Sequence, residues 1–517
     1  MRRAEFARGA CVSVACLVSL VGLFATASVA AERRPNVLFI VSDDLNTLLG
    51  CYGDPLAKTP SIDRLAARGV RFERAYCTYP LCGPSRNSFL TGLHPNATGI
   101  RTNGQIFRQS IPSQPSMPQA FRQAGYFVAR IGKLYHYNVP RSVGTNGHDD
   151  TASWELELNP AGVDRLEEEP HIFSLTPGQF GGTLSWYASP KGDAHHTDAM
   201  MADDAAWVLE RCARDRSRPF FLAVGFFRPH TPYVAPEQPY FQMHPEAAMP
   251  VVTGIEADRT DIPRAALESE KKEQEKLTDD LRRKCRQAYN ASISFMDAQV
   301  GKVVDALDRL GLADDTIVVF TSDHGYHMGE HGLWQKMSLF EESARVPLLV
   351  VAPGHGRPGS TVAAPVSQVD IFPTLATLCG VTQPANLQGQ SLVPLLADPQ
   401  AEGRGWALTQ LIRAGMRGQT PAKPGVGPLP AKTFAGSSLR TARWRYTEWD
   451  EGRQGRELYD HDTDPRELTN LAEVADYAAD VERLSKQLRE AVAGSFPPDG
   501  RVPEVREGIW NPSLTSE

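Results

Sequence analysis

Polar side chains that could do acid–base or metal chemistry follow four short apolar runs of the sequence. The runs are NVLFIV near Val37, YFVARIG near Val128, FFLAVGFF near Ala223 and TIVVFTS near Val318. Runs of this length and composition predict strands that are buried on both faces. The residues that follow them are Asp43 and Asp44, Lys133 and His136, Arg228 and His230, and Asp323 and His324. One such pair is often only a turn or a helix cap. Four pairs together predict a site at the carboxyl edge of an α/β sheet.

A cysteine inside YPLCGPSRNSFLTG, which begins at Tyr79, is a candidate for chemistry. A zinc-binding cysteine would have a second Cys or His nearby at ligand spacing, and none follows Cys82 closely. Pro84 is favoured in the first turn of a helix, so a helix is expected to begin here. The free amides of its N-terminus, together with Arg86, would attract a tetrahedral anion to Cys82.

The same residues resemble a known family. Cys82-Gly83-Pro84-Ser85-Arg86, followed by Thr91-Gly92, resembles the C-x-P-S-R signature of type I, formylglycine-dependent sulfatases. The segments NVLFIVSDDL, GKLYH, RPHTP and SDHGYHMGEHGLWQK resemble that family's metal-binding, lysine–histidine, histidine and second metal-binding segments. Asp323-His324, GEHGLWQK and LRTARWRYTEW are similar to its iduronate-2-sulfatase branch. The resemblance extends from about Pro35 to about Leu471.

This resemblance implies an exported, metal-dependent sulfatase with an alkaline-phosphatase-like α/β fold. A formylglycine-generating or maturase enzyme would convert Cys82 to formylglycine before folding. One hydroxyl of the aldehyde hydrate would attack sulfur to give a covalent sulfo-enzyme, and the second hydroxyl would then expel sulfate. The substrate would be a sulfated saccharide, specifically a uronic-acid 2-sulfate at a chain end.

The resemblance also implies a set of site residues. The catalytic residues would be Cys82, Arg86, Lys133, His136, His230 and Lys336. The metal ligands would be Asp43, Asp44, converted Cys82, Asp323 and His324, a mainly oxygen set that favours Ca²⁺ and leaves Mg²⁺ open. His230 is the candidate general acid. His136, His230 and Lys336 would also contact the substrate.

The order of elements predicts an α/β fold with a mostly parallel sheet sandwiched between helices. Helices are expected over residues 60–68 and 279–310, and residues 138–196 read as long loops. Residues 237–283 are proline-rich and then strongly charged, which predicts a solvated surface insertion. We expect a catalytic domain at 32–400 and a smaller α+β subdomain at 401–517, with a helix over 477–493.

Residues 1–31 have the three parts of a secretory signal peptide, with cleavage after Ala30 or Ala31. The alternative is an N-terminal membrane anchor, for which the apolar run is short. No later run is long and apolar enough to span a bilayer, so we expect a periplasmic or secreted protein without stable membrane insertion. The net charge of -7 argues against a nucleic-acid partner. Of eight cysteines, Cys11 and Cys16 lie in the leader, and the other six are too sparse to form a disulfide scaffold.

Two other functions remain open for this sequence. One is a phosphonate or phosphodiester hydrolase on the same fold, because phosphate and sulfate are similar tetrahedral anions. The other is a non-catalytic saccharide-binding relative, in which Cys82 would stay unmodified. His327 and His331 are spaced like a helical zinc pair, but the glycines around them disfavour a helix and predict loop packing or support of the site.

Overall fold

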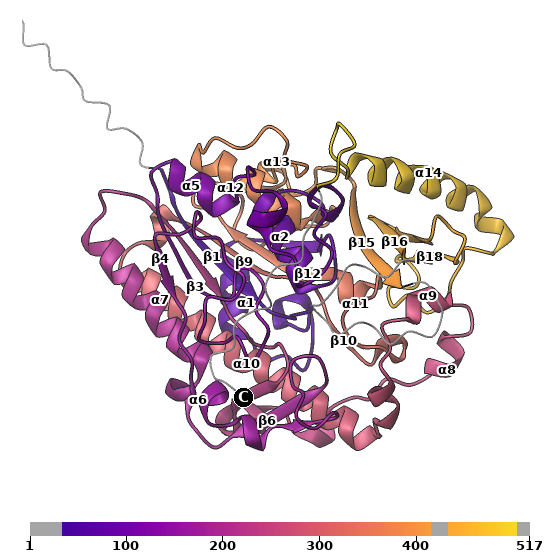
Figure 1. Cartoon of the computed structure of the whole chain (residues 1–517), viewed down its shortest axis with the longest axis horizontal. Coiled ribbons are helices and arrows are strands. Elements are labelled where there is room, and N and C mark those ends of the chain that lie inside the picture. The colour runs from indigo at the N-terminus through magenta and orange to yellow at the C-terminus, as the bar shows by residue number, and fades with distance from the viewer. Residues whose placement is uncertain (1–33, 415–432, 504–517) are drawn as a thin grey trace, which may run out of the picture. The chain divides into compact units, whose positions relative to one another are not determined.

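The computed structural model describes residues 34–414 and 433–503, and its centre is a nine-stranded sheet (Figure 1). The strand order is β13-β2-β12-β9-β1-β7-β3-β4, and β14 pairs with β2. The bounds are β1 Asn36–Ser42, β2 Val70–Tyr76, β3 Phe127–Gly132, β4 Leu156–Leu158, β7 Phe220–Gly225, β9 Thr316–Ser322, β12 Arg345–Val351, β13 Ser360–Val362 and β14 Val366–Ser367. All neighbouring strands are parallel except for the two pairs that β12 makes with β2 and β9.

Helices cover both faces of this sheet, because side chains along a strand alternate between its faces. In β1, Leu38 and Ile40 pack on the side of α1, α7 and α10. Val37, Phe39 and Val41 pack on the other side, with α2, α5 and α12. Figure 1 shows these two layers. The helix bounds are α1 Pro60–Arg68, α2 Cys82–Thr91, α5 Met117–Gln123, α7 Thr197–Arg214, α10 Asp279–Arg309 and α12 Ile371–Cys379.

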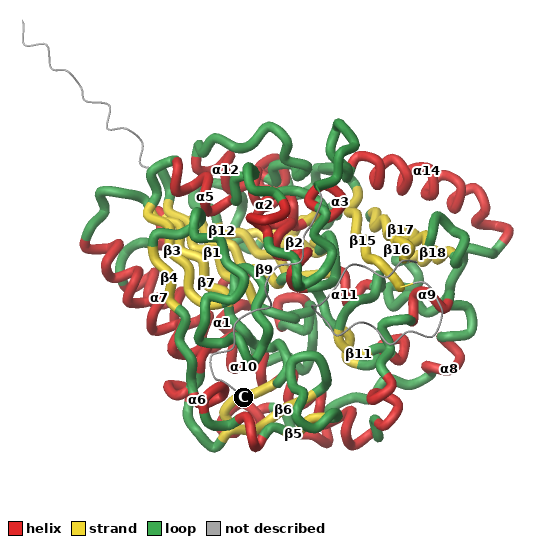
Figure 2. Tube along the Cα trace, viewed as in Figure 1, coloured by secondary structure: helices red, strands yellow, loops and turns green. Residues whose placement is uncertain are grey.

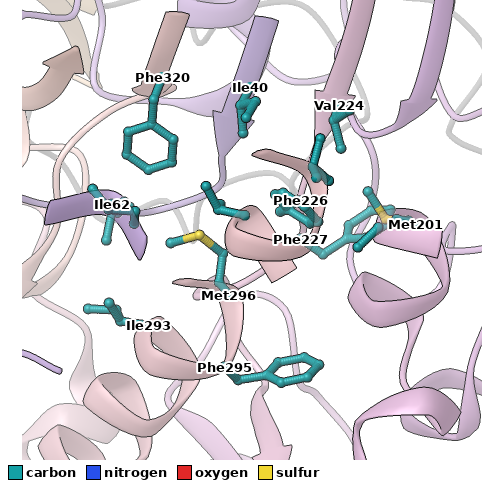
Figure 3. Close-up of a cluster of buried hydrophobic side chains, with 14 of the residues drawn as sticks. Ile40, Ile62, Met201, Val224, Phe226, Phe227, Ile293, Phe295, Met296 and Phe320 are labelled. Atoms are coloured by element: carbon teal, nitrogen blue, oxygen red, sulfur yellow. The ribbon is translucent and has the colours of Figure 1, made fainter. Parts of the chain in front are cut away.

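The larger of the two apolar layers is drawn in Figure 3. Ile40, Val224 and Phe320 come from three adjacent strands and face Met296 of α10 and Met201 of α7. All five side chains are buried. Dense packing of this kind resists displacement. The carboxyl ends of β1, β7 and β9 are therefore held in fixed positions.

The C-terminal part of the chain forms a separate antiparallel sheet of four strands, in the order β15-β16-β17-β18, with one helix against it. The bounds are β15 Trp406–Ala414, β16 Thr433–Thr441, β17 Trp444–Trp449, β18 Arg456–Asp460 and α14 Ala478–Gly494. Leu439 and Tyr446 of the sheet pack against Leu484 and Leu488 of the helix. The predicted fold class is therefore confirmed, including the smaller α+β part.

This second sheet also supports the chain that leads to Cys82. The Thr409 hydroxyl donates to the carbonyl of Cys77 (2.6 Å), and the backbone N–H of Gln410 donates to the carbonyl of Thr78 (2.9 Å). Both acceptors lie between the end of β2 and the start of α2. The antiparallel sheet therefore fixes the entry to the helix that carries Cys82.

Short helices and strands fill the connections between these larger elements (Figure 2). Their bounds are α3 Pro95–Thr98, α4 Phe107–Ser110, α6 Val163–Leu166, β5 Phe173–Ser174, β6 Ser185–Ser189, β8 Tyr233–Pro236, α8 Ile255–Asp258, α9 Arg264–Leu267, β10 His327–Met328, β11 Trp334–Gln335, α11 Glu341–Ala344 and α13 Val393–Ala397. Residues 138–196 are thus not loops alone, because β5, β6 and β8 form a small sheet. Residues 237–283 are only partly solvated, since His244 and Gln274 are buried while Lys272 and Lys276 are exposed.

The predicted signal peptide at residues 1–31 lies outside the described residues. Among the residues that the structure describes, no helix is both long and apolar enough to cross a membrane. The six cysteines of the described ranges are all free thiols.

Candidate active site

The predicted site residues meet at one edge of the central sheet. β1, β3, β7 and β9 are mutually parallel, so their carboxyl ends bring Asp43, Lys133, His230 and Asp323 to the same edge. β2 runs in the same direction and leads into α2 at Cys82. β12 runs the opposite way, so the segment before it, which carries Lys336, reaches this edge as well. The predicted convergence on one site is what the sheet topology produces.

Cys82 is the first residue of α2 and is buried, with 1% of its surface exposed. Its Sγ lies 3.3 Å from His324 Nε2, 3.3 Å from Lys336 Nζ and 4.0 Å from Asp44 Oδ1. Burial alone would raise the pKa of this thiol, but Lys133, Lys336 and His324 hold it well below its ordinary value. The site thus stabilises negative charge at the position of the Cys82 side chain.

Asp44, Cys82, Asp323 and His324 form a buried group whose ligand atoms lie within 4.8 Å of one another. His324 Nδ1 faces the carbonyl of Gly325 at 2.9 Å, and a carbonyl only accepts. The ring must therefore carry its proton on Nδ1 when neutral, which leaves the Nε2 lone pair directed at the cluster. Asp44 Oδ2 is buried without a hydrogen-bond partner among the described residues. Carboxylate oxygens and one imidazole fit a divalent cation.

The two other charged groups of the cluster have shifted pKa values. Burial raises the pKa of Asp323 to about 7, against the opposing effects of His324 and Arg86. The pKa of His324 lies at about 9, because the charges of Asp323 and Cys82 outweigh its burial. The shift of His324 shows that negative charge is crowded at this point, which favours a cation.

Asp43 lies beside this group, but its oxygens are already engaged. Arg86 Nη2 donates to Oδ1 (3.0 Å) and Lys133 Nζ donates to Oδ2 (2.6 Å). Arg86 Nε also donates to Asp323 Oδ2 (3.0 Å), and its Nη1 donates to the Lys133 carbonyl (2.6 Å). Burial would raise the pKa of Asp43, yet Lys133, His230 and Arg86 hold it below its ordinary value. Arg86 therefore joins the ends of β1 and β9 through their carboxylates.

Three further predicted residues line the site around Asp44 and Cys82. Lys336 Nζ lies 2.5 Å from Asp44 Oδ1, and the charges of Asp44 and Cys82 raise its pKa despite burial. His230 Nδ1 faces the Thr231 carbonyl (2.6 Å), so its Nε2 points to Asp44 Oδ2 at 3.7 Å. His136 hydrogen-bonds Cys82, and burial lowers the pKa of its imidazole to about 3. A neutral imidazole at His136 can accept or relay one proton here.

His327 lies in β10 and His331 in the short 3-10 turn Glu330–Gly332, so the two do not share a helix. Both rings also face Glu342 Oε2, at 4.0 and 3.9 Å. His327 Nε2 lies 2.6 Å from Ser338 Oγ. His331 Nδ1 lies 3.1 Å from Asp258 Oδ2, and its ring stacks on Phe340 at a centroid distance of 4.0 Å. The preference for packing over a helical zinc pair agrees with these contacts.

Sequence reasoning overlooked two residues near the site. The buried Gln368 Oε1 accepts from Ser85 Oγ (2.9 Å), and so ties α2 to the start of α12's segment. Lys271 comes from the charged run ESEKKEQEK, and its ammonium contacts Gln335, the neighbour of Lys336. No motif marks either residue, and in a run of charged residues the half-buried Lys271 cannot be told from the exposed lysines beside it.

This arrangement defines a hydrolase of anionic tetrahedral esters: an alkaline-phosphatase-like sheet presents a buried nucleophile position between cations and acids. The family model described as Sulfatase matches residues 35–381, and the chain belongs to the sulfatase family. It is a sulfuric ester hydrolase.

Relatives within and beyond this family have several substrates. Choline-sulfatase of Rhizobium meliloti is 33% identical over 85% of this chain and 83% of its own length. Iduronate 2-sulfatase of Homo sapiens is 30% identical over 80% of this chain and 84% of its own length. The solved structure of the phosphonate monoester hydrolase of Agrobacterium radiobacter has a TM-score of 0.72 at 26% identity and covers 93% of this chain and 100% of its own.

Proposed function

We propose that this sulfatase hydrolyses the 2-sulfate of a uronic acid at the end of a saccharide chain, with Cys82 converted to formylglycine and Ca²⁺ bound. The observation that carries the proposal is the position of Cys82 Sγ, 3.3 Å from both Lys336 Nζ and His324 Nε2 at the N-terminus of α2. The likeness of this chain to iduronate 2-sulfatase supports the uronate. The likeness to choline-sulfatase shows why the substrate needs its own test.

The residues of the chain have distinct proposed tasks. Lys133 and Lys336 would neutralise the sulfate oxygens, since both ammonium groups lie against the acids that line the site. His136, which hydrogen-bonds Cys82, would orient the side chain at position 82 and the bound sulfate. Arg86 would hold Asp43 and Asp323 in place.

His230 is the proposed general acid. Its Nδ1 proton is committed to the Thr231 carbonyl, so the proton for the leaving sugar oxygen must be carried on Nε2. Nε2 is also the atom that faces Asp44 and the interior of the site. A proton delivered there lowers the barrier for an alkoxide leaving group far more than for an acidic phenol.

Two groups that the chain itself does not encode complete the site. Once oxidised, residue 82 would supply a hydrated aldehyde hydroxyl as the nucleophile, for which the Cys82 Sγ atom marks the position. Asp44, Asp323 and His324 would hold the cation, and Asp43 could join them only through the remaining lone pairs of its oxygens, which already accept from Arg86 and Lys133. The cation would polarise a sulfate oxygen and lower the pKa of a neighbouring hydroxyl.

The test of the covalent chemistry is the mass of the tryptic peptide AYCTYPLCGPSR, residues 75–86, from protein purified out of its native host. Cys77 lies in the same peptide and serves as an internal control for ordinary oxidation. Formylglycine at position 82 with an alkylatable thiol at Cys77 supports the proposal. An unmodified Cys82 would refute it and leave a saccharide-binding relative as the function.

A phosphonate monoester hydrolase is the second candidate, because the solved structure of such an enzyme is 26% identical to this chain over nearly its whole length. The measurement is kcat/KM on an aryl sulfate and on the matched aryl phosphonate monoester. If kcat/KM is higher on the phosphonate than on the sulfate, the phosphonate monoester is the preferred substrate and the proposed function is wrong.

We further propose that residues 1–31 are a cleaved leader, that the protein is exported, and that residues 32–400 and 401–517 are the catalytic and C-terminal parts. N-terminal sequencing of the mature protein tests the first point. A mature chain that begins at Ala31 or Glu32 is expected, and one that keeps Met1 would argue for a membrane anchor.

A further inference from the structure

Lys271 is a half-buried cation that enters the active-site region from the segment predicted to be a solvated insertion. Its Nζ donates to the carbonyl of Gly182 and to Gln335 Oε1. Both acceptors are neutral. Among the described residues, no carboxylate forms an ion pair with Lys271, whereas the neighbouring Lys272 is exposed.

The two acceptors belong to two segments, here called walls, that flank the candidate site: the segment of Gln335 and Lys336, and the segment of His230 with Gly182 beside it. Gln335 directly precedes Lys336, whose Nζ contacts Asp44 and Cys82. Gly182 follows Gly181, whose carbonyl accepts from the hydroxyl of Thr231 (2.9 Å), the residue after His230. Lys271 therefore spans from the wall that carries His230 to the wall that carries Lys336.

The charge of Lys271 lacks the compensation that the other cations of the site have. Arg86 and Lys133 contact Asp43, and Lys336 contacts Asp44. An ammonium that is partly withdrawn from water and held only by neutral oxygens is stabilised by an anionic partner. Burial lowers the pKa of Lys271 to about 8. The charges of Glu273 and Asp44 partly offset this effect, and the charge of Lys336 adds to it.

We propose that Lys271 binds the carboxylate of the uronic acid and so selects a carboxylated sugar sulfate over a neutral one. This inference rests on the proposed uronate 2-sulfate substrate. In a pyranose ring, C2 and C5 stand across from each other, so the carboxylate on C5 projects away from the 2-sulfate. With the sulfate at Cys82, the carboxylate would lie on the far side of the sugar ring, toward Gly182 and Gln335, which Lys271 bridges. A Cβ added at Gly182 would meet no atom within 4 Å, which leaves open space beside this contact.

The experiment compares wild type, Lys271→Met, Lys271→Gln and Lys272→Met on three substrates. These are a disaccharide with a terminal uronic acid 2-sulfate, the same disaccharide with its carboxyl reduced to a hydroxymethyl group, and an aryl sulfate. Lys271→Gln keeps a neutral donor for the Gly182 carbonyl, and Lys272→Met removes an exposed lysine from the same segment. Turnover of the aryl sulfate reports that each variant is folded and carries the working nucleophile.

A charged hydrogen bond to the carboxylate predicts a loss of about 10- to 100-fold in kcat/KM for both Lys271 variants on the carboxylated disaccharide. The loss should lie mainly in KM, and the reduced disaccharide, the aryl sulfate and Lys272→Met should show none. An equal loss on all three substrates would mean that Lys271 only ties the two walls together, and no loss would mean that it does not touch substrate. Either result overturns the inference. If wild type hydrolyses the aryl sulfate but neither disaccharide, the uronate substrate itself is wrong, and the inference fails with it.

Discussion

Replacing Arg86 by methionine should destabilise the metal-free protein, because Arg86 is the link between two buried carboxylates. The side chains of Arg86, Asp43 and Asp323 are all fully buried, and both ion pairs have N–O distances of 3.0 Å. Breaking a buried pair by removing one partner costs about 3–5 kcal/mol. Asp43 keeps Lys133, and the Oδ1 of Asp323 keeps two backbone amides, so the lower end of that range is expected.

The expected shift in melting temperature follows from the size of the chain. For 517 residues, an unfolding entropy of about 2.1 cal/mol/K per residue gives about 1 kcal/mol per degree. Arg86→Met should therefore lower Tm by about 3 °C. Scanning calorimetry in EDTA is the assay, since a bound cation would compensate for the lost charge. Arg86→Lys, which keeps the charge but not the fork of donors, should fall between wild type and Arg86→Met.

The matched control is Arg64→Met, which removes an arginine paired with Asp305 on the surface. The two side chains are 50% and 64% exposed, and such pairs contribute about 0–1 kcal/mol. Its Tm should stay within about 1 °C of wild type. If Arg86→Met shifts Tm no more than Arg64→Met does, the linking role assigned to Arg86 is refuted.

Three further predictions concern the chemistry of the site. His230→Gln should lower kcat on a sugar sulfate by about 10²- to 10⁴-fold and on an aryl sulfate much less, and equal losses would contradict its role as general acid. Removing divalent cations should abolish turnover. Adding Ca²⁺ at about 100 times its Kd to the metal-free protein should raise the free energy of unfolding by about 2.7 kcal/mol. The variant Asp44→Asn should lose this stabilisation. For the carboxylated disaccharide, kcat/KM should fall as pH rises through about 8, because Lys271 loses its proton there, whereas the aryl sulfate should show no such step unless Lys271 acts on the sulfate. Below this pH the lysine stays charged, so the carboxylate contact is fully present on the acidic side.

Much of the fold was accessible from the sequence because its elements are strongly patterned. The apolar runs near Val37, Ala223 and Val318 became adjacent strands of the sheet, and the predicted helix over 279–310 is α10, Asp279–Arg309. Residues 138–196 were harder, since β5 and β6 have only 2 and 5 residues and pair with the distant β8. Short strands of this kind are stabilised by long-range pairing rather than by a local pattern.

The candidate site was accessible for a related reason. Acidic and imidazole side chains, such as Asp43-Asp44 and Asp323-His324, directly follow several buried strands, and a parallel sheet brings strand ends together. Arg228 also follows a strand, so the sequence could not show that Arg228 has a structural role and is not a site residue. In the structure Arg228 pairs with Asp164 at 2.6 Å and supports the loop before His230. Which side of a loop a side chain faces depends on partners that are distant in sequence.

By itself, the sequence determined the kind of chemistry: a Cys82 motif at a helix start, acids and imidazoles at strand ends, and the family to which they belong. Only the tertiary structure decided which of these groups contact one another. It places Arg86 between Asp43 and Asp323 and brings Lys271, from a run of charged residues, to the wall beside Lys336. The physical reason is that charge pairing and burial are properties of neighbours in space. A sequence shows which charges exist, whereas the fold sets which of them are compensated and which remain to bind a substrate.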